Sequence, residues 1–535
     1  MKFSRRQFIA SGLIAGGLAG LGKYAGLFSP RAIPGAILGA SSAYGHRLRD
    51  EKFPEPVRII RKTVAIVGGG IAGLSAGYAL NKAGMHDFQL LELEAETGGN
   101  SHSGQNAVSA YPWGAHYVPL LTPESKVAHQ LFRDFGIIKG YDAHGLPIYD
   151  EFFLCADPHE RLYMHGRWQD GLIPATGIGA EVEAQYQRFF ALMEAYKTLR
   201  GGDGKKVFAI PVDASSQDAQ WLALDHLTMR QWLERQGYTA QELHWYVNYC
   251  CRDDYGTTYE ETSAWAGLHY FSARAGRAAN ADAGAVLTWP QGNGWLAQRL
   301  AAPIKDQLHT HAMVYRVTER GSGVWVDYVD RHSNEAVRIE ARAAILAVPR
   351  FVAARLVRSE RFAFAAEGHS YAPWAVANVT LDAMPLNGGG APLSWDNVAY
   401  RSPLLGYVTA THQNTQMHPT QTVLTYYWPL SHLAPDAARR EALARSYPEW
   451  QHAFVTELLA LHPDLAGRIR QLDVWLWGHA MIRPTRGFIW GAARRQALQQ
   501  HAPLFTAHSD MSGISIFEEA ATHGVTAAER ALQWL

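Results

Sequence analysis

A glycine-rich turn between an apolar run and a helical pattern constrains the fold of this chain more than any other feature. Residues 63–67 read Thr-Val-Ala-Ile-Val, a run typical of a buried parallel strand. The next six residues, 68–73, match the pattern G-x-G-x-x-G, and residues 74–83 are predicted to form a helix. A strand, this turn and a helix in that order indicate a dinucleotide-binding βαβ unit.

The glycines of this turn have separate physical roles. Gly68 permits the tight turn, Gly70 lets the backbone approach a pyrophosphate, and Gly73 lets the helix pack closely on the strand. The helix N-terminus then offers unpaired N–H groups and a partial positive charge to phosphates. The predicted cofactor-binding positions of this turn are Gly68, Gly70, Ala72 and Gly73.

A carboxylate after the second predicted strand indicates where the nucleotide ribose binds. Residues 88–92 form another apolar run that ends in Glu92, about 20 residues beyond the last glycine, where an acid accepts hydrogen bonds from the adenosine ribose. Glu94 is a competing candidate, and Glu92 is preferred because it ends the run. An acid at this position disfavours NADP, whose 2′-phosphate favours an arginine.

A second glycine pair follows the ribose acid. Residues 92–101 resemble the E-x-x-x-x-x-G-G-[RN] segment of the flavin-containing amine oxidase superfamily, which also includes phytoene desaturases and protoporphyrinogen oxidases. Residues 113–117 are similar to the segment that lies along the flavin ring in that family. The resemblance implies FAD as the cofactor. It adds these cofactor-binding positions: Gly99, Asn100, Gly114, Ala115, His116 and Tyr117.

The end of the chain resembles the segments that close the flavin site in the same family. Residues 475–487 are similar to its W-x-x-A…P-G strand, and residues 504–528 to its last strand and helix. In the family this helix directs its N-terminus at the flavin N1–C2=O edge, where reduced flavin is negative. The resemblance assigns Ile516 and Phe517 to that edge and Asp510 to the ribityl–phosphate part. The departures from the family pattern are His508, Glu519 and His523.

The fold implied by the resemblance is α/β: a glutathione-reductase-like FAD-binding Rossmann domain with an interleaved α+β substrate domain of the amine-oxidase type. Residues 287–296 resemble the turn that returns the chain to the FAD domain, and Val314 begins a strand that contacts the adenine in the family. The predicted FAD-binding domain comprises residues 61–125, 287–350 and 481–535. The predicted substrate domain comprises residues 126–286 and 351–480.

The position of the family's lysine limits how far the reaction can be predicted. Many amine oxidases of the family place a lysine on a substrate-domain strand, where water bridges it to flavin N5. The corresponding run here, residues 373–380, has Asn378 at the approximate position and contains no lysine. Asn378 and His116 are therefore the candidate catalytic residues.

Aromatic and acidic residues are the candidates for a substrate pocket, and the chain holds 17 Trp and 24 Tyr. Aromatic walls with carboxylates suit a cationic amine, through cation–π contacts and ion pairing. The same residues also fit a packed core and a helix surface, and both interpretations stay open. The candidate substrate residues are Asp254, Tyr426, Trp428 and Trp477.

The preferred function is hydride transfer from an amine or polyamine C–H to flavin N5, loosely similar to that of exported bacterial spermidine dehydrogenases. An FAD-dependent desaturase or oxidase of an apolar, isoprenoid-like substrate is a second reading, and it predicts a pocket without carboxylates. A non-catalytic flavin-binding or electron-transfer subunit is a third, and it predicts no turnover with any amine. Oxygen, a quinone or a cytochrome would accept the electrons, and a homodimer stays open.

The cysteines limit the chemistry of the cofactor and of metals. The chain has three, Cys155, Cys250 and Cys251, with no C-x-x-C pattern and none beyond residue 251. We therefore expect free buried thiols, no metal site, and FAD that is bound noncovalently unless a histidine makes a bond.

The first residues resemble a twin-arginine export signal. Arg5 and Arg6 precede an apolar stretch, 8–22, that is shorter than a bilayer span requires. We expect residues 1–45 to be the signal region, with small residues at 40–43 available for cleavage, and residues 46–60 to be a linker arm. The expected location is periplasmic or exported through the twin-arginine machinery, with membrane anchoring if the signal is retained. The net charge of zero gives no support for a nucleic-acid partner.

Overall fold

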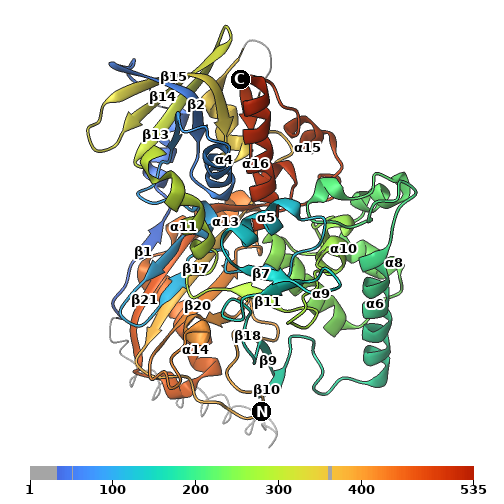
Figure 1. The fold of residues 1–535 in the computed structure, drawn as a ribbon. Helices are drawn as coiled ribbons and strands as arrows, with labels where there is room; N and C mark the ends of the chain where they lie inside the picture. The colour runs from blue at the N-terminus through green and yellow to red at the C-terminus, as the bar shows by residue number, and fades with distance from the viewer. Residues whose placement is uncertain (1–32, 51, 360–363, 365) are drawn as a thin grey trace, which may run out of the picture.

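The computed structural model describes residues 33–50, 52–359, 364 and 366–535. Two eight-stranded sheets organise this part of the chain, one in an upper domain and one in a lower domain, with a group of helices beside them (Figure 1). Sequence-distant segments build each sheet, because the chain passes between the two domains several times.

The upper sheet contains the predicted dinucleotide unit. Its strands run in the order β12-β3-β2-β15-β14-β13-β16, and β22 also pairs with β15. The parallel strands are β2 (Arg58–Val67), β3 (Phe88–Leu91), β12 (Leu308–His309), β15 (Ala336–Leu346) and β22 (Leu504–Thr506). β13 (Ala312–Arg320) and β16 (Val357–Arg358) also pair with each other in parallel, and β14 (Gly323–Asp330) is antiparallel to its neighbours β13 and β15.

The two faces of the upper sheet bury different sets of side chains, as the two-residue period of a strand requires. Val64 and Ile66 face α4 (Ile71–Lys82) and α16 (Phe517–Trp534) in one core. Alternate residues, Ala65 and Val67, face β13, β14 and α12 (Arg350–Leu356) in another. Burial on both faces explains why residues 63–67 are a continuous apolar run.

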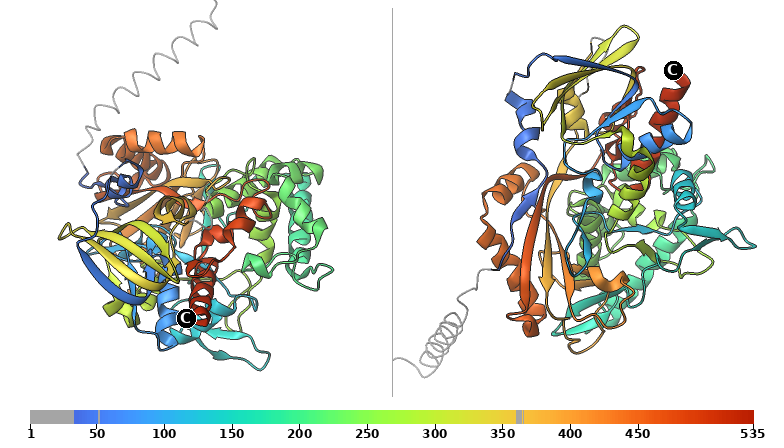
Figure 2. Two further views of the ribbon diagram at one scale, coloured as in Figure 1. Left: turned by 90° about the horizontal axis from the view of Figure 1, so that it is seen from above. Right: turned by 60° about the vertical axis from the view of Figure 1, so that its left-hand side comes forward.

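The lower sheet carries the substrate domain, in the order β1-β21-β17-β20-β19-β18-β9-β10. Helices α13 (Pro435–Ala444) and α14 (Tyr447–Leu461) cover one face (Figures 1 and 2), and the other face packs against other segments of the chain, among them Trp113, Tyr249 and Cys250. The strands are β1 (Ile37–Gly39), β9 (Glu160–Met164), β10 (Arg167–Asp170), β17 (Tyr371–Leu381), β18 (Asp396–Ala399), β19 (Tyr407–Thr409), β20 (Thr422–Pro429) and β21 (Ile469–Ile482).

A helical layer completes the substrate domain and shares one apolar core. Its helices are α6 (Ala180–Thr198), α7 (Ala219–Leu222), α8 (Met229–Arg235), α9 (Gln241–Tyr255) and α10 (Ala264–Ala273). The remaining short elements are β4 (Ser103–Gln105), β5 (Ala110–Pro112), β6 (Tyr117–Pro119), β7 (Ile138–Tyr141), β8 (Pro147–Tyr149), β11 (Val286–Thr288), α5 (Lys126–Asp134), α11 (Gly294–Ala301) and α15 (Ala492–Ala497).

The segment before the dinucleotide unit differs from the sequence-based expectation. The expected signal region, residues 1–45, and linker arm, residues 46–60, contain regular elements in their described part: β1 joins the lower sheet, followed by α2 (Ser42–Gly45) and α3 (Arg47–Asp50). The predicted signal motif, Arg5-Arg6 and residues 8–22, lies outside the described residues. In the described part of the chain, no helix combines the length and the apolar character of a membrane span.

Candidate flavin and substrate site

One large cavity lies between the two domains, with a volume of about 1710 Å³. A pocket for a single small molecule measures roughly 300–1,000 Å³, so this one has room for a dinucleotide and a substrate together. Its walls come from both ends of the chain and from the middle. Of the predicted cofactor residues, those that line it are Gly68, Gly70, Ala72, Glu92, Gly99, Asn100, Gly114, Ala115, His116, Tyr117, Val314, Asp510, Ile516 and Phe517.

The first glycine turn has the geometry that pyrophosphate binding needs. Gly68 adopts a φ of 103°, which favours glycine, and Gly70 is the N-cap of α4. A Cβ on Gly73 would lie 1.9 Å from the carbonyl oxygen of Gly68, so only glycine lets the helix start this close to the strand. Gly73 therefore shapes the turn without lining the cavity. At the N-terminus of α4, no side chain in the described part of the chain caps the helix.

The second glycine pair lies directly against the first turn. Gly70 and Gly98 form an isolated parallel bridge, and a Cβ on Gly99 would come within 3.1 Å of the Gly70 Cα. Gly114 is similarly constrained, since its Cβ would lie 2.3 Å from the carbonyl oxygen of Asn100. Three glycine-dependent segments thus converge on the part of the cavity where the sequence predicts the diphosphate.

Glu92 sits beside this turn with its carboxylate held by backbone donors. One oxygen accepts a hydrogen bond from the N–H of Gly69 at 2.6 Å, and the other accepts one from Glu94 at 2.8 Å. Burial raises the pKa of Glu92 to about 7 despite these bonds. The carboxylate of Glu94, the competing ribose candidate, instead accepts hydrogen bonds from Ser41. Both acids line the cavity, and Glu92 remains the predicted ribose acid.

Asp510 is the buried acid at the other end of the cavity, and its side chain is 2% exposed. It accepts hydrogen bonds from the Arg350 N–H at 2.8 Å and from the Tyr371 hydroxyl at 2.5 Å. Burial alone would raise its pKa, but the ion pair with His508 and these bonds hold the pKa below its ordinary value. His508, a departure from the family pattern, therefore stabilises the charge of Asp510.

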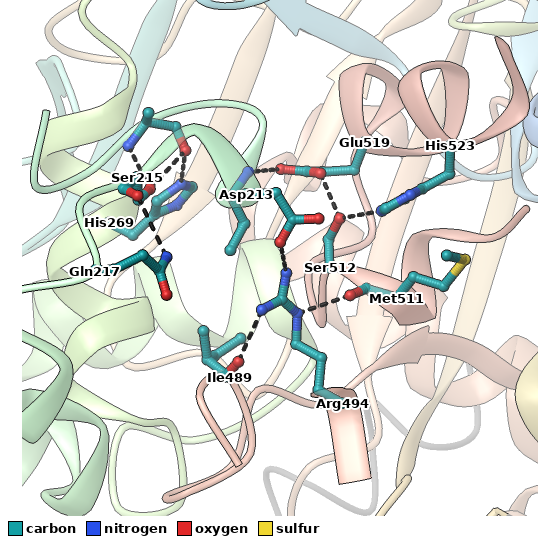
Figure 3. Close-up of polar contacts among 12 residues, drawn as sticks. Asp213, Ser215, Gln217, His269, Ile489, Arg494, Met511, Ser512, Glu519 and His523 are labelled. Atoms are coloured by element: carbon teal, nitrogen blue, oxygen red, sulfur yellow. Dashed lines mark hydrogen bonds and ion pairs between the residues drawn. The ribbon is translucent and has the colours of Figure 1, made fainter. Parts of the chain in front are cut away.

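The other two departures, Glu519 and His523, anchor the start of α16 (Figure 3). The Ser512 hydroxyl is hydrogen-bonded to Glu519 and lies 2.7 Å from Nε2 of His523. Glu519 also accepts a hydrogen bond from the N–H of Val212 at 2.6 Å, which ties α16 to the helical layer. Burial raises the pKa of Glu519 to about 8 and lowers that of His523 to about 4, so both side chains are neutral at pH 7.

An ion pair between Arg494 and Asp213 lies next to this network and secures the turn before α16 (Figure 3). The Arg494 guanidinium also donates to the carbonyl oxygens of Met511 at 2.7 Å and Ile489 at 3.0 Å. The first turn of α16, with Ile516 and Phe517 at the cavity wall, is thus fixed from both sides.

Of the two candidate catalytic residues, only His116 reaches the cavity. Its ring stacks on Tyr427 with centroids 4.6 Å apart, and burial lowers its pKa to about 4. Asn378 is 2% exposed; it donates to the carbonyl oxygen of Pro112 at 3.1 Å and accepts from Thr425 at 2.6 Å. It therefore joins strands and does not line the cavity, and Val376, two residues earlier on β17, lines it instead.

Two of the predicted substrate residues face the wrong side of the lower sheet. Tyr426 is fully buried and Trp428 packs edge-on against Trp450 of α14, with centroids 5.6 Å apart. Because strand side chains alternate, Tyr427 between them points to the cavity, where its hydroxyl donates to the carbonyl oxygen of Gly114 at 3.0 Å. The prediction that Tyr426 and Trp428 line a substrate pocket is therefore wrong, and Tyr427 lines the cavity instead.

The other two predicted substrate residues, Asp254 and Trp477, line the cavity. The Trp477 indole N–H donates to the carbonyl oxygen of Trp113 at 2.6 Å. Asp254 forms a buried ion pair with Arg274, whose guanidinium also donates to the Tyr117 hydroxyl at 3.1 Å. The charge of Asp254 is therefore already balanced by the protein.

Its neighbour Asp253 also lines the cavity, and its carboxylate has no hydrogen-bond donor within the described chain. Burial, together with the negative charge of Asp254, raises the pKa of Asp253 to about 7. Two further acids lie near it, Glu160 of β9 and Asp396 of β18, which are direct partners in the parallel register of those strands. Desolvation raises the pKa of both, although Glu160 lies at the exposed start of β9.

We call Asp253, Glu160 and Asp396 the acid trio. Sequence analysis missed it, since its members are far apart in the chain and none belongs to a motif. Like charges directly opposite each other on a sheet are destabilising, and no cation in the described chain forms an ion pair with Asp253 or Asp396. Aromatic side chains surround the trio: Tyr246, Tyr249, Tyr270 and Trp395 belong to or pack on the same apolar cluster.

A family model described as flavin containing amine oxidoreductase matches residues 71–532. Among solved structures, putrescine oxidase bound to putrescine is similar with a TM-score of 0.63 at 16% identity, covering 89% of this chain and 100% of that one. Cyclohexylamine oxidase from Brevibacterium oxydans IH-35A has a TM-score of 0.62 at 16% identity, covering 88% and 99%. A fatty acid isomerase from P. acnes has a TM-score of 0.59 at 15% identity, covering 88% and 98%.

Curated relatives match over a short segment only. L-amino acid oxidase of Cerastes cerastes is 38% identical over 77 residues, which are 14% of this chain and 14% of that protein. L-amino-acid oxidase of Notechis scutatus scutatus is 36% identical over 77 residues, again 14% of each chain. The chain thus matches about one seventh of the length of these relatives.

Proposed function

Because the chain belongs to the flavin-containing amine oxidoreductase family and is an FAD-dependent oxidoreductase, we propose that its substrate is a cationic amine with a second charged nitrogen. When bound, FAD accepts the two electrons of the C–H oxidation. The residues that would hold it are the converging glycine segments, Glu92, Asp510 and the first turn of α16. The choice of substrate rests on the acid trio beside the cavity.

Charge and aromatic surface together favour a cation at this wall. Asp254 is neutralised by Arg274, whereas Asp253 has no such partner. A ligand ammonium near Asp253 would offset the repulsion within the acid trio, which the charges of Arg274 and Arg252 offset only in part. Tyr427 and Trp374 line the same cavity and offer ring faces to a cation.

The remaining residues orient the substrate without opposing its charge. His116 stays neutral at pH 7 because burial lowers its pKa to about 4, so it does not repel an ammonium group. Val376 presents an apolar side chain from β17.

Anaerobic mixing with matched amines tests this proposal. A linear diamine should bleach the oxidised flavin absorbance at lower concentration than the monoamine of the same chain length, since only the diamine places a second ammonium at the acid trio. An apolar substrate class is favoured instead if neither amine bleaches the flavin and an isoprenoid-like compound does. The fold accommodates such chemistry in principle, because the fatty acid isomerase shares it. No bleaching by any compound indicates a flavin-binding subunit.

We also propose that FAD is held noncovalently and that the protein is exported. No cysteine in the described chain lines the cavity, although His46, His116, His369, His479 and His508 do. Acid precipitation should therefore release free FAD into the supernatant, and yellow colour that stays in the pellet would contradict this.

Export is supported by Arg5 and Arg6 before residues 8–22, and replacing both arginines with lysine should retain the protein in the cytoplasm. Oxygen, a quinone and a cytochrome remain the candidate electron acceptors.

A further inference from the structure

Residues 33–49 form a continuous segment that reaches from the lower domain to the upper domain, and we call it the clasp. Figure 2 shows it running up one side of the molecule, from the edge of the lower sheet to the upper domain. It contains β1, α2 and most of α3. Neither the predicted signal nor the predicted linker arm accounts for such a docked segment.

The lower end of the clasp is part of the substrate domain. β1 pairs in parallel with β21, with Ile37 opposite Val474 and Gly39 opposite Leu476. Ile33 packs on the core beneath α14. The two segments approach each other closely. A Cβ on Gly35 would lie 1.7 Å from the carbonyl oxygen of Leu472, so glycine is required there.

The upper end of the clasp is fixed to the dinucleotide unit. The backbone N–H and the hydroxyl of Ser41 both donate to the carboxylate of Glu94, each at 2.7 Å. The Arg331 guanidinium lies 3.8 Å from the centre of the Tyr44 ring and donates to Ser41 Oγ at 3.3 Å. Leu48 packs on the core of the upper sheet. Hydrogen bonds to a charged carboxylate are among the stronger ones in proteins.

Between these anchors the clasp covers the cavity. The residues of the clasp that line it are Ile37–Gly39, Ala40, Ser41, Ser42, Gly45, His46, Leu48 and Arg49. Glu92, the predicted ribose acid, lines the same cavity and is hydrogen-bonded to the backbone of Glu94, to which Ser41 is attached. The clasp is therefore adjacent to the part of the cavity predicted to hold the adenosine ribose.

We propose that the clasp is the outer wall of the FAD site, and that the Ser41–Glu94 contact must open before FAD is released. The clasp acts by covering the adenosine half of the cofactor, while the glycine turns and Glu92 bind it. For an exported flavoprotein such a wall has a purpose, since the cofactor has to be retained after loading. The inference rests on the FAD of the family and not on the amine, so its test is independent of the proposed substrate.

The proposal also determines which part of the N-terminus the mature protein keeps. Cleavage within residues 40–43, where small residues are available, would separate β1 from the rest of the chain. A processed protein that retains the clasp is cut before Ile33. The intact mass of the protein recovered from the periplasm measures this directly, and a mature chain that starts at or after residue 41 would contradict the proposal.

The release rate of FAD tests the clasp in the full-length holoenzyme. Ser41→Ala and Glu94→Gln each remove part of the upper anchor, and each should speed the release of FAD about tenfold, followed by the rise of flavin fluorescence on dilution. Because Glu94 acts through Ser41, the double variant should release FAD no faster than the faster single variant. Additive effects would mean that Glu94 contacts the cofactor independently of the clasp, and would overturn the proposed role of the contact.

A matched control separates this effect from the loss of any hydroxyl–carboxylate bond. Ser333 donates to Asp330 at 3.2 Å in a turn of the upper domain, outside the clasp. Ser333→Ala should leave the release rate within about twofold of the parent. Release from Ser41→Ala at the parent rate, with the variant folded and loaded by its melting temperature and its absorbance, would overturn the proposal.

Discussion

Glu92 is the residue on which the nucleotide end of the site depends. Its buried carboxyl is held at the first glycine turn by two backbone N–H groups. Glu92→Ala removes the acceptor for the ribose hydroxyls and should weaken FAD binding about tenfold or more, measured by fluorescence titration of the apoprotein. Glu96→Ala is the control, since Glu96 is exposed and does not line the cavity. Equal affinities of the two variants would contradict the assignment.

Glu519 gives the protein a pH-dependent stability. Burial raises its pKa to about 8 from 4.5, so the folded state favours the protonated form. Its contribution to stability is fully present below about pH 4.5 and is lost as the pH rises through 8. Glu519→Gln keeps an acceptor for Val212 and a donor for Ser512 without the ionisation.

The variant should therefore lose less stability than the parent between pH 5 and 8, by on the order of 2 kcal/mol. Chemical denaturation of the holoprotein at several pH values measures the difference. Glu96→Gln, at an exposed position, should follow the parent. Parallel stability curves for Glu519→Gln and the parent would show that the carboxyl of Glu519 does not titrate in this range.

Single residues differ in how much the sequence reveals about them. Gly68, Gly70 and Glu92 were predictable, because a local pattern of about 25 residues contains the whole turn and its ribose acid. The acid trio was not predictable, since Glu160, Asp253 and Asp396 meet only through the pairing of β9 with β18 and the docking of α9. Asp254 was predicted in its place, and its partner Arg274 lies 20 residues away on the next helical segment.

At the level of elements, the packing of α16 on α4 positions the flavin end of the cavity. Gly524 of α16 lies against α4, and a Cβ there would come within 2.2 Å of the Ala72 carbonyl oxygen. Gly524→Ala should lower the free energy of unfolding by about 2 kcal/mol or more, because two helices would have to move apart. Thermal and chemical unfolding measure this change.

The matched control for this pair of helices is Gly140→Ala. A Cβ on Gly140 would meet nothing within 4 Å, so this change should alter stability by less than about 0.5 kcal/mol. A Gly524→Ala variant as stable as the control would show that the two helices do not need this approach. Partial loss of FAD from Gly524→Ala is expected as well, since Ile516 and Phe517 begin the same helix.

A helix or strand was predictable where its own residues form a recognisable pattern, whereas the direction in which its side chains point was not. In β20, residues 422–429, Tyr426 and Trp428 face α14 while Tyr427 faces the cavity. Every residue of β20 is buried, so no alternation of polar and apolar residues reveals which face is which. Asn378 is a different case, because it shares a face of β17 with Val376 and lies two residues farther along the strand, beyond the cavity.

At the scale of the whole molecule, the sequence predicted two interleaved domains because the flavin segments at 68–117, 288–349 and 475–528 resemble one family. The family match over residues 71–532 confirms the membership, and the similar solved structures confirm the fold. The clasp lay outside that resemblance, and its apolar, glycine-rich residues were read with the signal that precedes them. Its pairing with β21 joins residues more than 400 positions apart, which no local pattern can report.

The pH dependence of diamine binding tests the proposed substrate most directly, because the charge of Asp253 carries it. With a pKa of about 7, Asp253 becomes charged as the pH rises from 6 to 8, so a linear diamine should bind more tightly over that range. The apparent Kd comes from the concentration dependence of anaerobic flavin reduction. Asp253→Asn should weaken diamine binding about tenfold or more and remove the rise, whereas Asp170→Asn, at an exposed acid outside the cavity, should keep both. Equal Kd values and pH profiles for Asp253→Asn and the parent would contradict the account.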